Sequence, residues 1–323
     1  MNRRLFFQLP LVALAVPLRL HAQSARKPAR IGVLSSSSPE SRSTFWEAFK
    51  DGMAKRGWIE GRDLTYIYRY ARGDSSRFDA LAAELVAEKP DVIFASTQSA
   101  ALAVKRATRE IPIVFALVNE PVETGLVASL ARPGGNATGL TGASVETRTK
   151  TLELLREIVP KLRRIAVLVS PGELGKQDLR SVGLAARTMH IEVDAMVVGN
   201  QDELNKALQW LGGKRPDGVL FLVSGVTTRG DVAKRMTELR LPAIYHIAEY
   251  VRAGGLISYG VELSDNFRRA AEYVDRILKG TKPGDLPVQQ PTVFELAVNL
   301  KTARAQGLTI PQSVLLRATT LIE

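Results

Sequence analysis

The sequence contains no cysteine. Without thiols the chain forms no disulfide, offers no thiolate to a zinc site, and carries no cysteine that could be lipidated after a leader peptide. Histidine is scarce as well, since the chain holds only His21, His190 and His246, so a multi-histidine metal centre is not expected. After the N-terminal region, no segment has the roughly 18 unbroken apolar residues that a membrane-spanning helix requires. The absences predict a chain that is held together by its apolar core.

The usual sequence patterns of catalysis are missing too. No Gly-x-Gly-x-x-Gly follows the first apolar run, which argues against a dinucleotide cofactor. There is no Gly-x-Ser-x-Gly elbow, and no Ser–His–Asp order suggests itself. We therefore expect no catalytic residue, no metal ligand, no cofactor and no enzyme activity.

Acidic residues are fewer than basic ones, and the formal charge is +11. It falls to +8 once Arg3, Arg4 and Arg19 are removed with the leader described below. The basic side chains are interspersed with acidic ones, as in Lys150–Glu157, and no run of five like charges occurs. Such mixing is typical of solvated helix faces, so nucleic acid is not expected as a partner.

The first 22 residues have the pattern of a secretory signal peptide. Arg3 and Arg4 precede a mostly apolar stretch, and Ala22 offers a small residue for cleavage before Gln23. The segment Asn2–Gln8 also fits a twin-arginine signal, so the Sec and twin-arginine routes both stay open. Either route predicts a periplasmic protein.

The rest of the chain repeats itself. Residues 30–35 (Arg-Ile-Gly-Val-Leu-Ser) are echoed by 164–170, 89–96 by 215–224, and 111–115 by 241–245. Each repeat is a short apolar run followed by a helical pattern, which indicates alternating strands and helices around a parallel sheet. The predicted fold class is α/β, with two Rossmann-like lobes that have parallel sheets and are joined by a three-segment hinge. We place lobe 1 in residues 23–142 plus 261–285, and lobe 2 in 143–260 plus 286–323.

The expected strands and helices follow from this alternation. Strands are predicted at 31–35, 64–70, 92–96, 113–118, 137–141, 165–170, 192–198, 219–223, 243–246 and 256–259. Helices are predicted at 43–56, 76–88, 98–108, 145–159, 176–189, 202–211, 231–239 and 265–279. The helix 265–279 is expected to pack back on lobe 1, and the segment 292–308 to return to lobe 2.

Polar residues follow the strands in both halves. Ligands of open parallel sheets bind beyond the carboxyl ends of the strands, so these residues are the candidate ligand-binding set. It comprises Ser35, Ser37, Ser96, Thr97, Gln98, Asn119, Glu120, Thr141, Ser170, Ser224, Tyr245 and Tyr259.

Each candidate also has a purely structural interpretation. Ser96 and Thr97 open a helix, where free amides could take a carboxylate, or where the hydroxyls only cap the helix. Glu120 could pair with an ammonium group or be a solvated loop acid. Tyr245 and Tyr259 could flank a flat ligand or be core aromatics.

Several longer strings resemble a known family. They are 121–127 (Pro-Val-Glu-Thr-Gly-Leu-Val), 130–139 (Leu-Ala-Arg-Pro-Gly-Gly-Asn-Ala-Thr-Gly), 241–245, 253–260, 277–288, 299–303 and 307–311. In these strings the chain is similar to substrate-binding proteins of ABC transporters, in the tryptophan/tyrosine-type branch with the type I periplasmic binding protein fold. Two positions depart from the family pattern, because Glu120 stands where the family usually has Asp, and Gly225-Val226 stands where it often has Asp-Pro. The second departure puts one lobe-2 contact, and a simple amino-acid ligand, in doubt.

The resemblance implies a function without a reaction. A periplasmic monomer would capture a small polar or aromatic, amino-acid-like solute between two lobes and deliver it to an ABC permease in the inner membrane. An alternative from another class is a ligand-sensing module that reports to a membrane receptor; the sequence does not separate the two.

Overall fold

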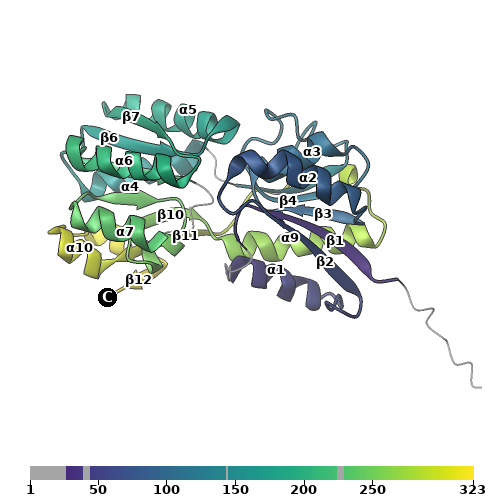
Figure 1. Cartoon of the computed structure of the whole chain (residues 1–323). Coiled ribbons are helices and arrows are strands. Elements are labelled where there is room, and N and C mark those ends of the chain that lie inside the picture. Colours follow the sequence, from purple (N-terminus) through teal and green to yellow (C-terminus); the bar gives the residue numbers. More distant parts are fainter. Residues whose placement is uncertain (1–26, 39–43, 143–144, 224–228) are drawn as a thin grey trace, which may run out of the picture.

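The computed structural model describes residues 27–38, 44–142, 145–223 and 229–323. The predicted signal peptide, the candidate Ser224 and the Gly225-Val226 departure lie outside these ranges. Two lobes stand side by side, each an open sheet with helices on both faces (Figure 1). None of the helices in these ranges combines the length and the hydropathy needed to cross a bilayer.

Lobe 1 contains a five-stranded sheet in the order β2-β1-β3-β4-β5, and every pairing in it is parallel. The strands are β1 (Ala29–Ser35), β2 (Leu64–Tyr70), β3 (Val92–Ala95), β4 (Ile113–Val118) and β5 (Ala137–Thr141). The helices are α1 (Thr44–Ala54), α2 (Phe78–Ala87) with the short η1 (Ser75–Arg77) before it, α3 (Gln98–Ala107), and, from much later in the chain, α9 (Leu263–Leu278) and η2 (Pro283–Asp285).

Lobe 2 contains a seven-stranded sheet in the order β12-β11-β10-β9-β8-β6-β7. Its strands are β6 (Arg164–Val169), β7 (Glu192–Val197), β8 (Gly218–Leu222), β9 (Ala243–Tyr245), β10 (Ile257–Val261), β11 (Phe294–Asn299) and β12 (Thr320–Ile322). Its helices are α4 (Val145–Ile158), α5 (Gly172–Thr188), α6 (Gln201–Lys214), α7 (Arg229–Glu238), α8 (Glu249–Arg252), α10 (Leu300–Gln306) and α11 (Gln312–Leu315).

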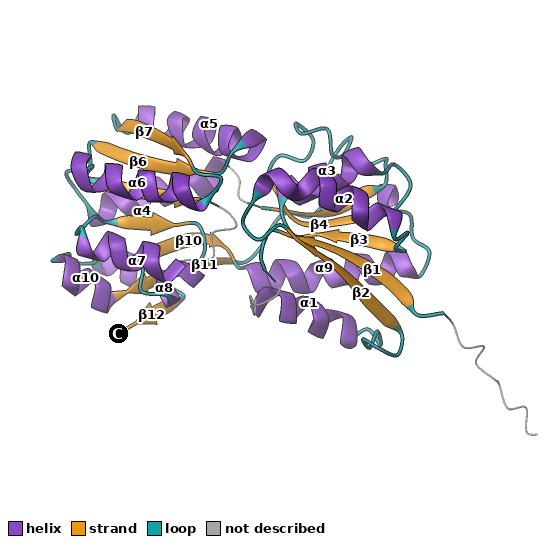
Figure 2. Ribbon diagram, in the orientation of Figure 1, coloured by secondary structure: helices purple, strands orange, loops and turns teal. Residues whose placement is uncertain are grey.

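Each sheet separates two apolar cores. In lobe 1, α2 and α3 cover one face, while α1 and α9 cover the other (Figure 2). In lobe 2, α4 and α5 bury their apolar sides on one face, and α6 and α7 on the opposite one. The inner parallel strands β3, β4, β6 and β8 are buried on both faces, which explains why their sequences are nearly continuous apolar runs.

Helix α9 belongs spatially to lobe 1 although it follows β10 of lobe 2. Phe267 of α9 lies 5.3 Å from the ring of Phe94 in β3 and 5.4 Å from Phe45 in α1. The helices α1 and α9 approach so closely that a Cβ placed on Gly52 would lie 2.8 Å from the Cβ of Ala271. A glycine is therefore required at this crossing.

Three chain segments cross between the lobes, and hydrogen bonds join them. Thr141, at the end of β5, donates its backbone N–H to Gln289 at 2.9 Å. Glu262, between β10 and α9, donates its N–H to Val293 at 3.1 Å. From α9, Asn266 donates from Nδ2 to the carbonyls of Ala116 and Thr141, both at 3.0 Å. The crossings thus form one connected bundle.

The structure confirms the α/β class, and most expected elements agree with it to within a few residues at their ends. One difference concerns β11, which pairs antiparallel with β10. The reason is topological, because the chain comes back from lobe 1 through the crossings and so enters the lobe-2 sheet from the opposite end. Helix α5 begins at Gly172, four residues before the expected start. The expected elements did not include α8, α10, α11, β11 and β12, although the segment 292–308 was expected to return to lobe 2.

Candidate functional site

The carboxyl edges of both sheets lie where the lobes approach each other. Strand β1 begins at the end of lobe 1 away from lobe 2, so β1 and its parallel neighbours run towards lobe 2 (Figure 1). Along this edge the strands end in the spatial order Tyr70, Ser35, Ala95, Val118 and Thr141. The polar residues that the sequence singled out in lobe 1 therefore share one edge.

Thr97 and Gln98 have different roles at the start of α3. The Thr97 hydroxyl accepts a hydrogen bond from the N–H of Ala100 at 3.4 Å, which is the capping role. Gln98 is buried, and its Oε1 accepts from the N–H of Asn119 at 2.8 Å. Its Nε2 donates to Oε1 of Gln177, on α5 of lobe 2, at 2.9 Å. Gln98 thus links two strand ends of lobe 1 to the other lobe.

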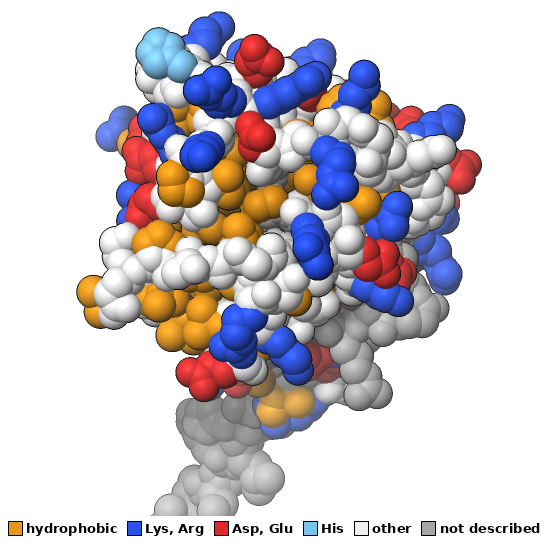
Figure 3. Space-filling view, turned by 90° about the vertical axis from the view of Figure 1, so that its left-hand side faces the viewer, with side chains coloured by type: hydrophobic (Ala, Val, Ile, Leu, Met, Phe, Trp, Pro, Cys, Tyr) orange, Lys and Arg blue, Asp and Glu red, His pale blue; other side chains and the backbone are white. Residues whose placement is uncertain are grey.

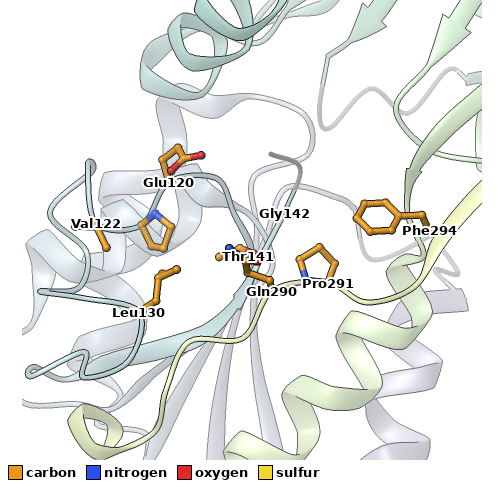
Figure 4. A pocket seen from close by; sticks show the side chains of 9 residues that line it. Glu120, Val122, Leu130, Thr141, Gly142, Gln290, Pro291 and Phe294 are labelled. Atoms are coloured by element: carbon orange, nitrogen blue, oxygen red, sulfur yellow. The ribbon is translucent and has the colours of Figure 1, made fainter. Parts of the chain in front are cut away.

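Glu120 and Thr141 line a pocket of about 130 Å³ beside the crossing segments. Figure 4 shows Glu120 at its upper rim, Thr141 and Gln290 in the middle, and the Phe294 ring opposite. The remaining lining residues are Pro121, Val122, Leu130, Gly142 and Pro291. Residues of both lobes and of two crossing segments therefore meet around one space.

The backbone at Glu120 is unusual. Its φ of +48° is in the left-handed region, which non-glycine residues adopt at a cost of about 1–2 kcal/mol. The side chain is exposed, so the strain is not repaid by burial. Strained residues of this kind gather at functional sites, because the surrounding fold must hold them in place.

The serines of lobe 1 differ in their hydrogen bonding. Ser35 and Ser37 pair through their hydroxyls at 2.8 Å, and the Ser37 N–H donates to the Ser35 hydroxyl at 3.2 Å. The Ser96 hydroxyl is buried and has no hydrogen-bond partner within the described part of the chain. Buried hydroxyls usually have a hydrogen-bond partner, so the Ser96 hydroxyl can still form a hydrogen bond to a bound solute.

In lobe 2 the candidates lie at different depths. Ser170 follows β6 and is 8% exposed. Tyr245 is fully buried and stacks on Tyr250 with 4.7 Å between ring centroids, so it lies in the core of the lobe. Burial raises the pKa of its hydroxyl far above the ordinary value. Tyr259 is half-buried and stacks at 5.9 Å on Phe294, which lines the pocket.

A buried ion pair escaped the sequence analysis. Arg148 of α4 donates from Nε to Oδ1 of Asp178 on α5 at 2.8 Å, and the two side chains are 7% and 2% exposed. Desolvation raises the pKa of Asp178, and the Arg148 charge opposes that rise. One signal could have found the pair, because Arg148, Leu152 and Leu155 share the inner face of α4 at i, i+4 and i+7.

The surface of lobe 2 away from lobe 1 carries charges of both signs. Figure 3 shows Lys and Arg side chains interspersed with Asp and Glu around a band of apolar side chains. Many of the basic residues are in ion pairs on the surface, such as Arg164 with Asp194. This mixture agrees with solvated faces rather than with one basic patch.

Comparisons with known proteins indicate one family. A family model described as ABC transporter substrate binding protein matches residues 30–322. The chain is 29% identical over 286 residues to a tyrosine-binding protein of Clostridioides difficile, covering 87% of this chain and 81% of that one.

Two solved structures are similar at 25% identity. One is an ABC domain of Streptococcus pneumoniae in complex with L-Trp, with a TM-score of 0.83 over 92% of this chain and 100% of that one. The other is the ligand-free, open structure of a substrate-binding protein with adhesive properties from Clostridium difficile, with a TM-score of 0.63 over 91% and 99%. At equal identity, the whole chain superposes better on the L-Trp complex than on the open structure.

Proposed function

The chain belongs to the family of ABC transporter substrate-binding proteins, and we propose that it is exported to the periplasm, where it captures an amino-acid-like solute between its lobes and delivers it to a permease. The observation that carries this proposal is the junction of the lobes. There Gln98 meets Gln177, and a pocket is lined from lobe 1, from lobe 2 and from the crossing segments.

The proposed mechanism is closure without a reaction. A solute that contacts both lobes binds the closed arrangement better than the open one, so it shifts the population towards the closed state. The permease would then distinguish the two states. The higher TM-score to the L-Trp complex than to the open structure supports the assignment of the present conformation to the closed state.

The crossing segments act as the hinge in this proposal. Three hydrogen-bonded crossings restrict the lobes to rotation about a common axis, whereas a single linker would leave them free. The short spans near Gly142, Glu262 and residues 286–293 would absorb the change in backbone angles.

The ligand contacts follow from the positions on the facing edges. Glu120 from lobe 1 would pair with the ammonium group of the solute. Ser96 has an unused hydroxyl at the same edge, and Asn119, Thr141 and Ser170 are nearby strand-end residues. Tyr259 would act through Phe294, on which it stacks. Because the relatives are named for tyrosine or were solved with L-Trp, an aromatic amino acid is the first solute class to test.

The test begins with the protein as it is purified. Native mass spectrometry of fresh protein should reveal a co-purified solute, and a thermal-shift screen of amino acids, aromatic acids, sugars and purines should raise the melting temperature for a narrow class. A ligand at 100 times its dissociation constant stabilises the folded state by about 2.7 kcal/mol, which gives a shift of several degrees. Absence of any shift across the screen, together with an empty native mass, would reject solute capture.

A further inference from the structure

The Arg148–Asp178 pair is incomplete as an ion pair. Its hydrogen bond uses Nε of the guanidinium and Oδ1 of the carboxylate. Within the described ranges, Asp178 is the one hydrogen-bond partner of the Arg148 guanidinium, so Nη1 and Nη2 donate to nothing. The second oxygen, Oδ2 of Asp178, is buried and has no hydrogen-bond partner among the described residues.

Such an arrangement is costly unless something else fills it. Taking a charged pair out of water is repaid only when the remaining donors and acceptors are also satisfied. Here the pair leaves two donor nitrogens of Arg148 and one anionic acceptor of Asp178 without a hydrogen bond in the described part of the chain. An ion pair with a purely structural role would be expected to close as a fork, with both carboxylate oxygens engaged.

The pair lies at the end of lobe 2 that faces lobe 1. Leu155, late in α4, is next to Gly218, the first residue of β8, where a Cβ would come within 3.0 Å of the Leu155 side chain. Arg148 is seven residues, or about 10 Å along the helix, closer to the carboxyl end of the sheet. On α5, Asp178 directly follows Gln177, which bonds to Gln98 of lobe 1. Both members are therefore beside the junction of the lobes.

We propose that Arg148 and Asp178 form the subsite for the charged end of an α-amino acid, with Nη1 and Nη2 of Arg148 holding its carboxylate and Oδ2 of Asp178 accepting from its ammonium group. This inference rests on the proposed function and narrows its solute class. A guanidinium fork matches a carboxylate with two parallel hydrogen bonds, and the bond from Nε to Asp178 fixes the plane of the fork. The carboxylate and the ammonium group of an α-amino acid are attached to one carbon atom. Their complementary groups, the two Nη atoms of Arg148 and Oδ2 of Asp178, belong to one ion pair.

The subsite also explains how binding would favour closure. An ammonium group has three N–H donors, so it can be shared between Asp178 on lobe 2 and Glu120 on lobe 1. The ion pair of Arg180 with Glu123, at 3.8 Å, already joins α5 to the segment that carries Glu120. The ammonium group of a solute bound to Arg148 and Asp178 on lobe 2 would thus reach the Glu120 carboxylate of lobe 1 only when the lobes are closed.

The experiment uses three matched probes on the full-length mature protein. L-tyrosine carries both charged groups, tyramine lacks the carboxylate, and 3-(4-hydroxyphenyl)propionate lacks the ammonium group. Titration calorimetry on the wild type should show L-tyrosine binding at least about 50-fold more tightly than either analogue, since each loses a charge-assisted contact. If the screen above identifies another α-amino acid, that solute and its two analogues replace these.

Two variants then separate ligand contact from structural support. Arg148→Gln should weaken the binding of L-tyrosine by at least about 20-fold and change the affinity for tyramine by less than about threefold. Asp178→Asn should weaken the binding of L-tyrosine more than the binding of 3-(4-hydroxyphenyl)propionate. Arg156→Gln is the matched control, since it removes the same charge from an exposed position on α4 and should leave all three affinities unchanged. If Arg148→Gln does not fold, Arg148→Lys replaces it, because lysine keeps the charge but lacks the forked guanidinium. This variant should also lose more affinity for L-tyrosine than for tyramine, by a smaller factor.

The outcomes distinguish this inference from the function on which it rests. Equal losses of affinity for L-tyrosine and tyramine in the Arg148 variants would mean that the ion pair has a structural role only. This result would overturn the subsite but leave the proposed solute capture intact. A native solute without a carboxylate would do the same. A wild type that binds no solute in any screen would overturn both.

Discussion

Gln98 and Gln177 are 79 positions apart in the chain and join the two lobes side chain to side chain, with Nε2 of Gln98 donating to Oε1 of Gln177 at 2.9 Å. Both side chains are buried. The other end of the Gln98 amide is also occupied, because Oε1 accepts from the N–H of Asn119. An amide held at both ends has a fixed orientation, so the contact between lobes is a specific one.

Replacing Gln177 with alanine should therefore weaken solute binding without unfolding either lobe. A neutral hydrogen bond contributes about 1 kcal/mol, and its loss from the closed state alone corresponds to about a fivefold higher dissociation constant. Titration calorimetry would measure the change. Gln209→Ala, on the exposed side of α6, is the control that should leave the affinity as it is. An unchanged affinity in Gln177→Ala would show that the contact does not distinguish the two states.

Glu120 gives a second prediction, because its backbone conformation affects stability while its side chain affects solute binding. Glu120→Gly relieves the left-handed strain at φ +48°, while glycine raises the entropy of the unfolded chain, so the free energy of unfolding should stay within about 1 kcal/mol of wild type. Loss of the carboxylate should nevertheless weaken binding about tenfold or more. Glu120→Gln, which keeps the length of the side chain, should match the binding loss. Full affinity in both variants would remove Glu120 from the site.

Two glycines give opposite expectations for the same substitution. Gly139 lies opposite Phe115 in the β4–β5 pair with φ +152°, and a Cβ there would be 2.0 Å from the Phe115 carbonyl oxygen. Gly139→Ala should lower the free energy of unfolding by at least about 3 kcal/mol, since the clash is with backbone. Gly183, inside α5, has open space around it. Gly183→Ala should instead stabilise by up to about 1 kcal/mol through helix propensity, and urea unfolding would measure both.

The Glu157 carboxylate on α4 predicts a pH dependence. Arg317 donates to Oε2 at 2.6 Å and Ser313 at 3.1 Å, and the hydrogen bond from Arg317 holds the pKa of Glu157 below its ordinary value of 4.5. A carboxyl whose pKa is depressed in the folded state stabilises that state above the ordinary pKa. The contribution is lost as the pH falls through the depressed value.

Arg317→Ala should thus lower the free energy of unfolding at pH 7, by less than about 1 kcal/mol because the pair is partly exposed. The difference from wild type should shrink steadily as the pH falls below 4.5. Urea unfolding of both proteins at pH 7 and at pH 3 would check this. A gap of constant size would assign the effect to packing of the Arg317 side chain instead.

Much of the fold could be predicted because its signals are local. The strand at 113–118 is a continuous apolar run between polar turns, and the structure places β4 at the same residues. The start of α5 was missed for a local reason too. Gly172 and Gly175 resemble a turn in the sequence, but both lie in α5. Gly175 is needed there because a Cβ would lie 1.8 Å from the Ser170 carbonyl oxygen.

The candidate site was less predictable, because its contacts join distant residues. Strand-end positions suggested Gln98, but nothing near it in sequence points to Gln177. Arg148 and Asp178 look like ordinary charges of amphipathic helices until their spacing to Leu152 and Val182 is considered, which puts both on inner faces. A charge on an inner face needs a partner, and only the folded chain reveals which one.

The placement of α9 has a consequence for how the protein is made. A ribosome releases the strands of lobe 1 early, yet Phe267, Ala270 and Val274, which cover the Phe49 and Phe94 side of that sheet, emerge more than 120 residues after β5. Until then only α1 covers that face of the nascent sheet. The first half of the polypeptide therefore depends on the last third to become stable, which favours folding after synthesis over folding during it.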